Sequence, residues 1–516
     1  MSKKNSRTKN TFINTGAGFL TRISNMIARF MLQTTLIKVL GIQYTGVSGL
    51  FTSVLTILSL AELGIGNAIT FELYKPLEEK NYKRIGALMN FYKYAYTFIA
   101  FFILTIGVGL IPFLNIFVKD VPDIKESIVL IYIMFILKNA VTYLLVYKST
   151  LLIANQKNYI VLKIQAIMCL LRTVLECGVV LITKNYFTYL IIEIIANVAQ
   201  NIIISRRVDI EYPEIKKYKN LKLDKKEQRN MFRSIKGLAM YRASFALGNG
   251  VDNIIISSVV GTGIVGLVSN YNLIVKEIDQ IIKQFYNAVI PSVGNLSVTE
   301  SKEKQHQVFL RLVFIDFWIS CFCAVSYFIL IQPFITLWLG EKYLYPLALP
   351  AVLAFDFYLA SMLSPISSFR NANGIFVKGQ YRPLIMTIIN VFLSILLGIK
   401  IGAVGVFLAT IISRLVTQWY DPYLLYKLVF KRSSKMFFLK YYFYMLLTIL
   451  CALIVINIAA IVQINNALGE IVFRSLLCIT IPNVIVIALF HKTDEFTYCT
   501  KQISNIISKI KMQISG

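Results

Sequence analysis

Two arginines stand in the middle of the first long apolar segment, NTGAGFLTRISNMIARFMLQ, residues 14–33. In a helix that turns about 100° per residue, Arg22 and Arg29 fall on one face. The other polar residues and the glycine on this face are Asn14, Gly18, Asn25 and Gln33. An arginine exposed to lipid at a helix centre costs at least about 2.5 kcal/mol, so this face should meet protein or a water-filled cavity. Because the planar guanidinium donates two parallel hydrogen bonds, the chemistry it favours is binding of an anion such as phosphate.

Cations and amides recur at helical spacing in later apolar segments. One face of the seventh segment carries Arg242, Asn249 and Asn253, and one face of the eighth carries Lys276, Gln280, Lys283 and Asn287. The fifth segment adds Arg172, with Glu176 one turn away. These patterns predict an interior lined by cations and amides. The pairs Arg172–Glu176 and Lys276–Asp279 are also readable as structural ion pairs, and Lys38, Lys148 and Arg370 as side chains that snorkel from span ends.

Acidic residues inside apolar segments are rare enough to be candidates for binding a coupling cation or a proton. They are Glu62, Glu176, Glu193, Asp252, Glu277, Asp279, Asp316 and Asp356. The candidates for a coupling-ion site are Glu62, Asp252, Glu277 and Asp279. Each of these acids could instead be the partner of a nearby cation.

Motifs for bond-making chemistry are absent from the sequence. It contains no GxxxxGK[ST] loop, HExxH or GxSxG motif, and its two histidines, His306 and His491, stand at span ends. The 7 cysteines are mostly isolated in apolar segments and suggest neither a metal site nor a disulfide framework. We therefore expect a protein that is not an enzyme and has no cofactor, with Na⁺ or H⁺ coupling left open.

The elements that position these residues are membrane-spanning helices. The chain of 516 residues is 57% hydrophobic and only 15% charged, and its mean hydropathy is +0.66. Apolar runs of about 20 residues recur throughout, as an all-α polytopic membrane protein requires. We predict about fourteen spans. Their limits are 11–39, 45–73, 85–113, 126–153, 159–182, 186–205, 234–260, 263–294, 307–338, 347–370, 383–399, 402–426, 441–462 and 468–490.

Lysine and arginine predict the orientation. Alternate loops that start with the N-terminus hold about 33 of these residues and the opposite loops about 5, which predicts cytoplasmic N- and C-termini. The net charge of +27 is therefore explained by membrane topology. Its basic residues lie in short juxtamembrane loops, so we expect no nucleic-acid partner.

An internal repeat predicts two lobes. With an offset of 220 residues, Arg22 and Ser24 match Arg242 and Ser244, Gly41 and Gly46 match Gly261 and Gly266, and Asn67-Ala68 match Asn287-Ala288. An even number of spans lies between the copies, so two six-helix lobes should be related by a pseudo-two-fold axis along the membrane normal. The predicted domains are a lobe at 1–205, a basic cytoplasmic linker at 206–233, a lobe at 234–426, two additional helices at 427–490 and a cytoplasmic amphipathic tail at 491–516.

Residues 39–92 carry specific motifs: LG-x-x-Y-x-G-V-x-G-LF, AELGIG-x-A-I and LYKPL-E. In these motifs the chain resembles the polysaccharide-unit flippases of bacterial capsule, exopolysaccharide and O-antigen pathways. That family belongs to a superfamily with multidrug and toxin exporters and peptidoglycan-precursor flippases. The resemblance is clearest over residues 11–155.

The resemblance implies a bacterial plasma-membrane transporter that works by alternating access. Its substrate would be an oligosaccharide linked by diphosphate to a polyprenyl lipid such as undecaprenol, with membrane lipids, a polysaccharide polymerase and glycosyltransferases as candidate partners. The expected diphosphate-binding residues are Arg22, Arg29, Arg172, Arg242, Lys276 and Lys283. The expected sugar-binding or polar-cavity residues are Asn25, Asn67, Asn249, Asn253 and Asn287. The alternatives are a peptidoglycan-precursor flippase, a drug/cation antiporter and a membrane sugar polymerase.

Overall fold

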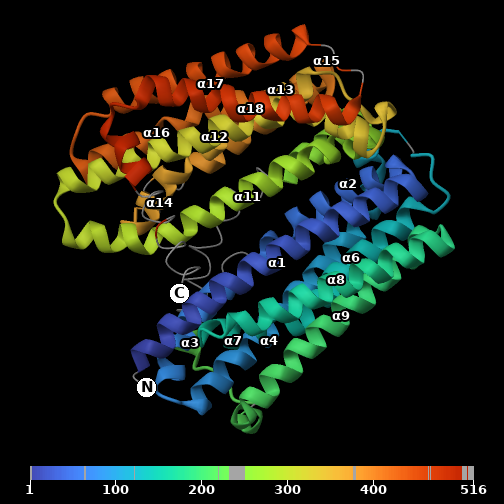
Figure 1. The fold of residues 1–516 in the computed structure, drawn as a ribbon. Coiled ribbons are helices and arrows are strands. Elements are labelled where there is room, and N and C mark those ends of the chain that lie inside the picture. The colour runs from blue at the N-terminus through green and yellow to red at the C-terminus, as the bar shows by residue number, and fades with distance from the viewer. Residues whose placement is uncertain are drawn as a thin grey trace. The chain divides into compact units, whose positions relative to one another are not determined.

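The computed structural model describes the chain apart from residues 1–2, 63–64, 121, 219, 230, 232–249, 376–378, 380, 463, 465, 502–507 and 509–516. All regular elements in the described residues are helices, which confirms the predicted all-helical class (Figure 1). The chain forms two compact units, Met1–Gly266 and Leu267–Gly516. The predicted lobe and linker boundaries stay predictions, because residues 232–249 lie outside the described part.

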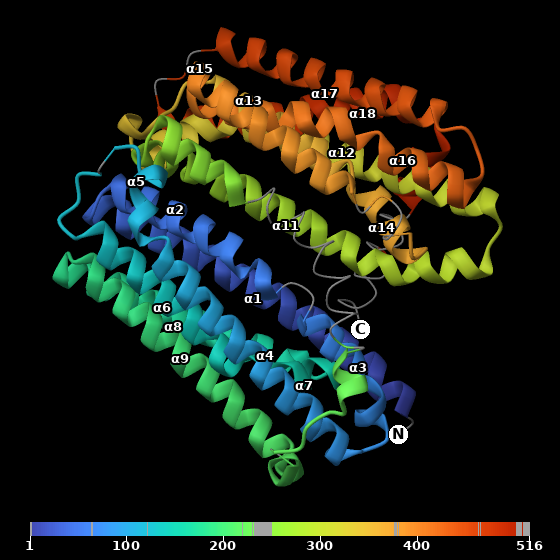
Figure 2. The same cartoon turned by 180° about the vertical axis from the view of Figure 1, so that it is seen from behind.

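The first unit contains the predicted spans one to six. Its main helices are α1 (Lys3–Val39), α2 (Ile42–Leu58), α3 (Ile65–Glu78), α4 (Tyr82–Gly109), α6 (Ile128–Val146), α7 (Ser149–Ala154), α8 (Asn158–Thr183) and α9 (Tyr186–Glu211). Shorter elements are η1 (Ser59–Glu62), η2 (Ile111–Phe113), α5 (Leu114–Phe117), η3 (Pro213–Tyr218) and the apolar helical segment Gly250–Val260, which ends in η4 (Ile256–Val260). The second span is thus α2 and α3 with a break between them, and the fourth is α6 and α7. Figure 2 shows α8 and α9 side by side in this unit.

The second unit contains the later spans. Its helices are α11 (Thr262–Thr299, which begins in the first unit), α12 (Lys302–Trp338), η5 (Glu341–Tyr343), α13 (Ala348–Ser361), α14 (Ser364–Ala372), α15 (Arg382–Gln418), α16 (Tyr420–Leu425), η6 (Tyr426–Phe430), α17 (Lys435–Ile461) and α18 (Ala467–Phe490). Helix α15 reverses at Gly402, which has φ +65°. Asn390 on one arm donates to Thr410 on the other at 2.8 Å. The reversal confirms the predicted eleventh and twelfth spans as an antiparallel pair.

Eight helical stretches of the described residues are long and apolar enough to cross a membrane. Several more predicted spans are helices interrupted by short breaks. Together they confirm the predicted polytopic membrane fold.

The linker predicted at 206–233 is folded where it is described. In η3, Tyr218 packs so closely on α4 that a Cβ added at Gly86 would lie 2.6 Å from the Cβ of Tyr218. Asn90 of α4 donates to the Leu221 carbonyl at 2.9 Å, and Arg84 pairs with Glu227 at 2.5 Å. This segment therefore packs against α4 of the first unit through a few residues, while most of its described side chains are exposed. The predicted tail helix falls mostly outside the described residues.

The turn after the first predicted helix recurs with the predicted offset of 220 residues. Gly41 has φ +109° and donates its N–H to the Leu36 carbonyl at 3.0 Å. Gly261 has φ +145° and donates to the Ile256 carbonyl at 2.9 Å. Both conformations are disfavoured for residues with a Cβ, which explains the two glycines. This equivalence supports the internal repeat.

The second pair of repeated glycines makes a reciprocal contact inside the first unit. A Cβ added at Gly46 would lie 2.2 Å from the Thr262 carbonyl oxygen, and one added at Gly266 would lie 2.5 Å from the Ile42 carbonyl oxygen. Residues 42 and 46 correspond to residues 262 and 266 in the repeat. A two-fold relation produces such swapped contacts, because each copy uses the same patch. Segments 42–46 and 262–266 are therefore locally two-fold related.

Ion pairs join the ends of the predicted fourth, fifth and sixth spans in both repeats. In the first unit, Lys148 pairs with Asp209 at 2.8 Å and Lys157 pairs with Glu211. In the second unit, Arg370 and Arg382 both pair with Asp421, Arg382 at 3.0 Å. Lys148 and Arg370, which were expected to snorkel from span ends, thus each pair with a carboxylate near the end of the last helix of their own repeat.

Candidate cationic transport site and hydroxyl network

Helix α1 presents three different faces. Small residues form the packed face against α8 and are all buried: Ala17, Thr21, Ser24 and Ala28. Thr21 donates to the Leu162 carbonyl of α8 at 3.1 Å. Large apolar side chains form a second, exposed face: Leu20, Ile23, Ile27 and Met31. The polar stripe lies roughly opposite this apolar face and about a quarter turn from the packed one.

The two arginines of this stripe remain accessible. Arg22 and Asn25 are half-buried, and Arg29 is exposed. Arg29 lies near Cys169 of α8. No acidic residue is present in the sequence of α1, so the stripe has positive charge along its length. The charge and partial exposure of this face suit it to attract an anion.

Arg172 is engaged within the first unit. Its Nε lies 3.4 Å from the Glu176 carboxylate, and its Nη1 donates to the Asn197 side chain of α9 at 3.0 Å. Glu176 is fully buried. These contacts favour the structural reading of Arg172, and its predicted role with diphosphate stays a prediction.

Helix α11 carries the second described stripe. Lys276, Lys283 and Asn287 are exposed, on a different face from the buried Ile282 and Tyr286. Lys283 donates to Asp279 at 2.6 Å, so this acid pairs with the lysine one turn further along the helix. The structure therefore supports one polar face along α11.

The remaining predicted amides have different positions. Asn253 donates to Ser53 of α2 at 3.0 Å, so it holds the segment Gly250–Val260 against α2. Asn67 lies in α3, but its side chain is outside the described part, as are residues Arg242 and Asn249.

The candidate coupling acids differ in burial and in their hydrogen-bond partners. Asp252 and Asp279 are half-buried and Glu277 is buried at 8% exposure. Glu62 ends η1 in the break of the second span and accepts a hydrogen bond from Tyr96 of α4 at 2.7 Å. Sequence reasoning missed Tyr96. The available signal was a pair of tyrosines, Tyr92 and Tyr96, one helical turn apart in the span after Glu62.

A cavity of about 570 Å³ lies between α3, α4 and α7. Its lining is rich in hydroxyl groups and aromatic rings. The polar lining side chains are Thr70, Tyr74, Tyr92, Tyr96, Ser149 and Thr150. The hydroxyl groups of Tyr92 and Tyr96 meet it beside Gly66, where an added Cβ would lie 3.1 Å from the Tyr92 oxygen. The cavity therefore opens onto a hydroxyl network that leads to Glu62.

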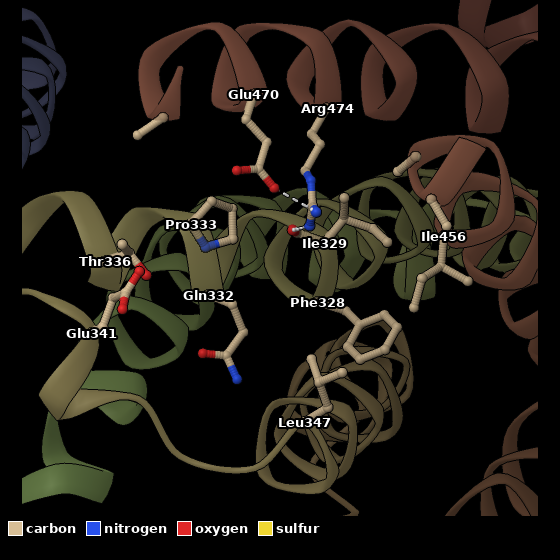
Figure 3. Close-up of a pocket in the computed structure, with 13 residues that line it drawn as sticks. Phe328, Ile329, Gln332, Pro333, Thr336, Glu341, Leu347, Ile456, Glu470 and Arg474 are labelled. Atoms are coloured by element: carbon tan, nitrogen blue, oxygen red, sulfur yellow. Dashed lines mark hydrogen bonds and ion pairs between the residues drawn. The ribbon is translucent and has the colours of Figure 1, made fainter. Parts of the chain in front are cut away.

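A second cavity, of about 450 Å³, lies in the second unit between α12, α17 and α18 (Figure 3). Pro333 cannot donate to the Ile329 carbonyl four residues earlier in α12. Arg474 of α18 donates to that carbonyl at 3.3 Å and pairs with Glu470 at 2.5 Å. The arginine thus compensates for a hydrogen bond that the proline removes.

A mid-span ion pair connects the fourth and sixth predicted spans of each repeat. In the first unit, Lys138 of α6 pairs with Glu193 of α9 at 3.0 Å. In the second unit, Asp356 of α13 pairs with Arg414 of α15 at 2.9 Å. The charges are exchanged between the two helices, so the connection is kept although the residues differ. Glu193 and Asp356 are therefore each the ion-pair partner of a cation on another helix of the same unit.

Metal-binding clusters of three or more His, Cys, Asp or Glu are not found among the described residues. No protein-family model matches the chain, and no curated protein matches it in sequence.

Solved structures show a clear likeness in fold. A structure of the lipid II flippase MurJ in an inward closed conformation has a TM-score of 0.64 and 14% identity, with 93% of this chain and 99% of that chain covered. A mutant of the Vibrio cholerae MATE transporter VcmN has a TM-score of 0.56 and 12% identity, with 84% and 100% covered. An inward-facing multidrug resistance MATE transporter of the MOP superfamily has a TM-score of 0.50 and 15% identity, with 78% and 98% covered. The chain therefore has the fold of these flippase and exporter structures.

Proposed function

We propose that this chain is a flippase of the MOP superfamily that moves a polyprenyl-diphosphate-linked oligosaccharide across the bacterial plasma membrane. The observation that supports this proposal most directly is the arginine stripe of α1. Arg22 is half-buried and Arg29 is exposed, and the helix contains no acidic residue. A diphosphate needs compensating cations when its head group leaves water. Arginine meets that need with bidentate hydrogen bonds.

The fold supports transport by alternating access. Similar folds occur in a lipid II flippase and in MATE transporters. Two repeated lobes can expose a shared site first on one side of the membrane and then on the other. Arg22, Arg29 and Arg242 would hold the diphosphate, while Asn25 and the amides of the later spans would contact the sugars. We expect the lipid tail to remain in the bilayer, because it is apolar.

A peptidoglycan-precursor flippase is the second candidate. It is favoured by the TM-score of 0.64 to the lipid II flippase MurJ. The two candidates share a lipid-linked diphosphate, so the arginine stripe serves either one. The sugar portion of the substrate distinguishes them.

Deletion of the gene in its own host tests the proposal. We expect loss of surface polysaccharide, with the lipid-linked repeat unit retained on the cytoplasmic face. Accumulation of peptidoglycan precursor on that face would instead select the second candidate. Normal polymer and normal cell-wall precursors, with changed drug susceptibility, would overturn both.

Complementation of that deletion tests the site. The Arg22→Ala, Arg29→Ala double variant should fail to restore export, although it is made and folded. Lys38→Ala is the matched control, because Lys38 is an exposed cation at the end of the same helix. Full export by the double variant would remove the diphosphate-binding role of the two arginines.

A further inference from the structure

We propose that the cavity between α12, α17 and α18 binds the head group of a zwitterionic phospholipid with a protonated amine, such as phosphatidylethanolamine. The ammonium group would face Glu341 and Glu470, and the phosphate would face Arg474. This site shares no residue with the arginine stripe of α1, so the inference does not depend on the proposed function.

The cavity lies at one end of three predicted membrane spans. Its lining residues come from the last turns of α12, the last turns of α17, the first two turns of α18 and the adjoining loops. The predicted topology places these helix ends on the side opposite the cytoplasmic termini. A lipid of the outer leaflet could therefore place its head group there.

The charged side chains are ordered along the spans as the charges of such a head group are. Glu341 follows the end of α12, and Glu470 lies in the first turn of α18. Arg474 lies four residues, or about 6 Å, deeper in α18 than Glu470. In an ethanolamine head group the ammonium is at the outer end and the phosphate is attached to the glycerol below it. The acids therefore stand at the level of the amine and the arginine at the level of the phosphate.

The net charge of the lining favours a lipid that carries an amine. Two glutamates and one arginine give the lining a formal charge of −1. Sites for anionic lipids are typically basic, because each cation offsets the phosphate charge. A lining of −1 disfavours an anionic lipid and accepts a zwitterion, whose ammonium group pairs with the carboxylates.

The three charged side chains are accessible, and one of them is held in position. Glu341 is exposed, and the side chains of Glu470 and Arg474 are 34% and 27% exposed. Figure 3 shows Arg474 reaching from α18 to the Ile329 carbonyl of α12, to which it donates at 3.3 Å, while it pairs with Glu470 at 2.5 Å. These contacts use two of the five N–H groups of a guanidinium, so its other N–H groups can donate to a phosphate.

The remaining lining suits a lipid better than a soluble ligand. The cavity of about 450 Å³ has the size of a small-molecule site. Three small residues near the ends of α17 and α18 leave this space open: Ala459, Ala460 and Ala467. Leu347 in the lining is 57% exposed, and Ile461, next to Ala460, is 79% exposed. Acyl chains can cover such apolar surface, and a soluble amine cannot.

Native mass spectrometry of the full-length protein in detergent tests the proposal. The protein would be titrated with phosphatidylethanolamine or with phosphatidylglycerol that carries the same acyl chains. We expect the wild type to bind phosphatidylethanolamine more tightly. Glu341→Gln should weaken that binding about 2- to 5-fold, as expected for the loss of one partly exposed ion pair. Glu303→Gln is the matched control, because Glu303 is an exposed acid of α12 that does not line the cavity.

A second variant tests the space without changing a charge. Ala460 is exposed and lines the cavity, so Ala460→Phe should fill part of it and also weaken binding. Equal binding of the two lipids by the wild type would overturn the proposal. Binding of phosphatidylethanolamine by Glu341→Gln or Ala460→Phe as tight as by Glu303→Gln would do the same. Displacement of the lipid by an equal concentration of soluble phosphoethanolamine would overturn the choice of a lipid as the ligand.

Discussion

Replacing Gly46 with alanine should loosen the contact between α2 and residues 261–266. The added Cβ would lie 2.2 Å from the Thr262 carbonyl oxygen and 3.3 Å from the Gly266 nitrogen. Both are backbone atoms, so neither can turn away, and the segments must separate by roughly 1 Å to reach ordinary contact. Overpacking of this kind costs about 1–3 kcal/mol.

Gly178 of α8 offers a matched control. A Cβ added there meets nothing within 4 Å. Alanine is favoured over glycine in a helix by about 1 kcal/mol, so Gly178→Ala should be neutral or slightly stabilising. Gly46 also lies in a helix, so this preference cancels and the two variants should differ in unfolding free energy by roughly the overpacking cost, about 1–3 kcal/mol.

Buried thiols supply the assay. Cys169 and Cys177 are free and buried in the same unit, so a thiol-reactive fluorophore labels them when the unit opens. The apparent unfolding temperature in detergent should be lower for Gly46→Ala than for Gly178→Ala. A Gly46→Ala midpoint equal to or above that of Gly178→Ala would refute the close approach at the repeat contact.

Two further predictions concern polar groups in the second unit. Arg474→Ala should lower the free energy of unfolding by about 1–3 kcal/mol, because the Ile329 carbonyl loses its donor. The loss should be smaller in a Pro333→Ala background, where residue 333 regains an N–H. Thermal unfolding of the wild type, the two single variants and the double variant measures this coupling, and an equal loss in both backgrounds would contradict the compensation. Asp421→Asn should lower the free energy of unfolding by about 3–5 kcal/mol, because two buried arginines lose their shared carboxylate. Asp209→Asn should lower it far less, because Lys148 and Asp209 are 22% and 32% exposed. Equal losses in the two variants would contradict the difference in burial.

The order of the spans was predictable because long apolar runs and basic loops are strong signals. The glycines of the repeat were predictable for a related reason, since a turn with positive φ and a close backbone contact both demand glycine. The break near η1 was not predictable. Residues 59–66 read SLAELGIG and continue the apolar run, so hydropathy gives no sign that the helix ends at Leu58 and resumes at Ile65.

The site was only partly predictable, because the sequence does not show which spans lie next to one another. A helical wheel shows that Arg172 and Lys148 share faces with other residues, but it gives no information on the neighbouring helix. The structure supplies Asn197 for Arg172 and Asp209 for Lys148. For Arg22 and Arg29 the wheel predicts only the face, which the structure separates from the packed face of α1. Their role with a diphosphate stays a prediction.

Tyrosines were overlooked for a different reason. Tyr92 and Tyr96 lie in the segment FYKYAYTF, which reads as an aromatic packing face. Their hydroxyl groups acquire meaning only when η1 brings Glu62 within 2.7 Å of Tyr96. Contact between separate spans creates this network, so the spacing of the two tyrosines shows a shared face but does not identify Glu62 as the partner.

Translocation in vesicles tests the central claim most directly. Purified protein would be reconstituted into vesicles that contain an undecaprenyl-diphosphate-linked oligosaccharide, and access of an external sugar-modifying reagent to the inner-leaflet pool would be measured over time. We predict that the wild type and Lys38→Ala make this pool accessible, whereas the Arg22→Ala, Arg29→Ala double variant does not. No movement by folded wild-type protein, or equal movement by the double variant, would contradict the account.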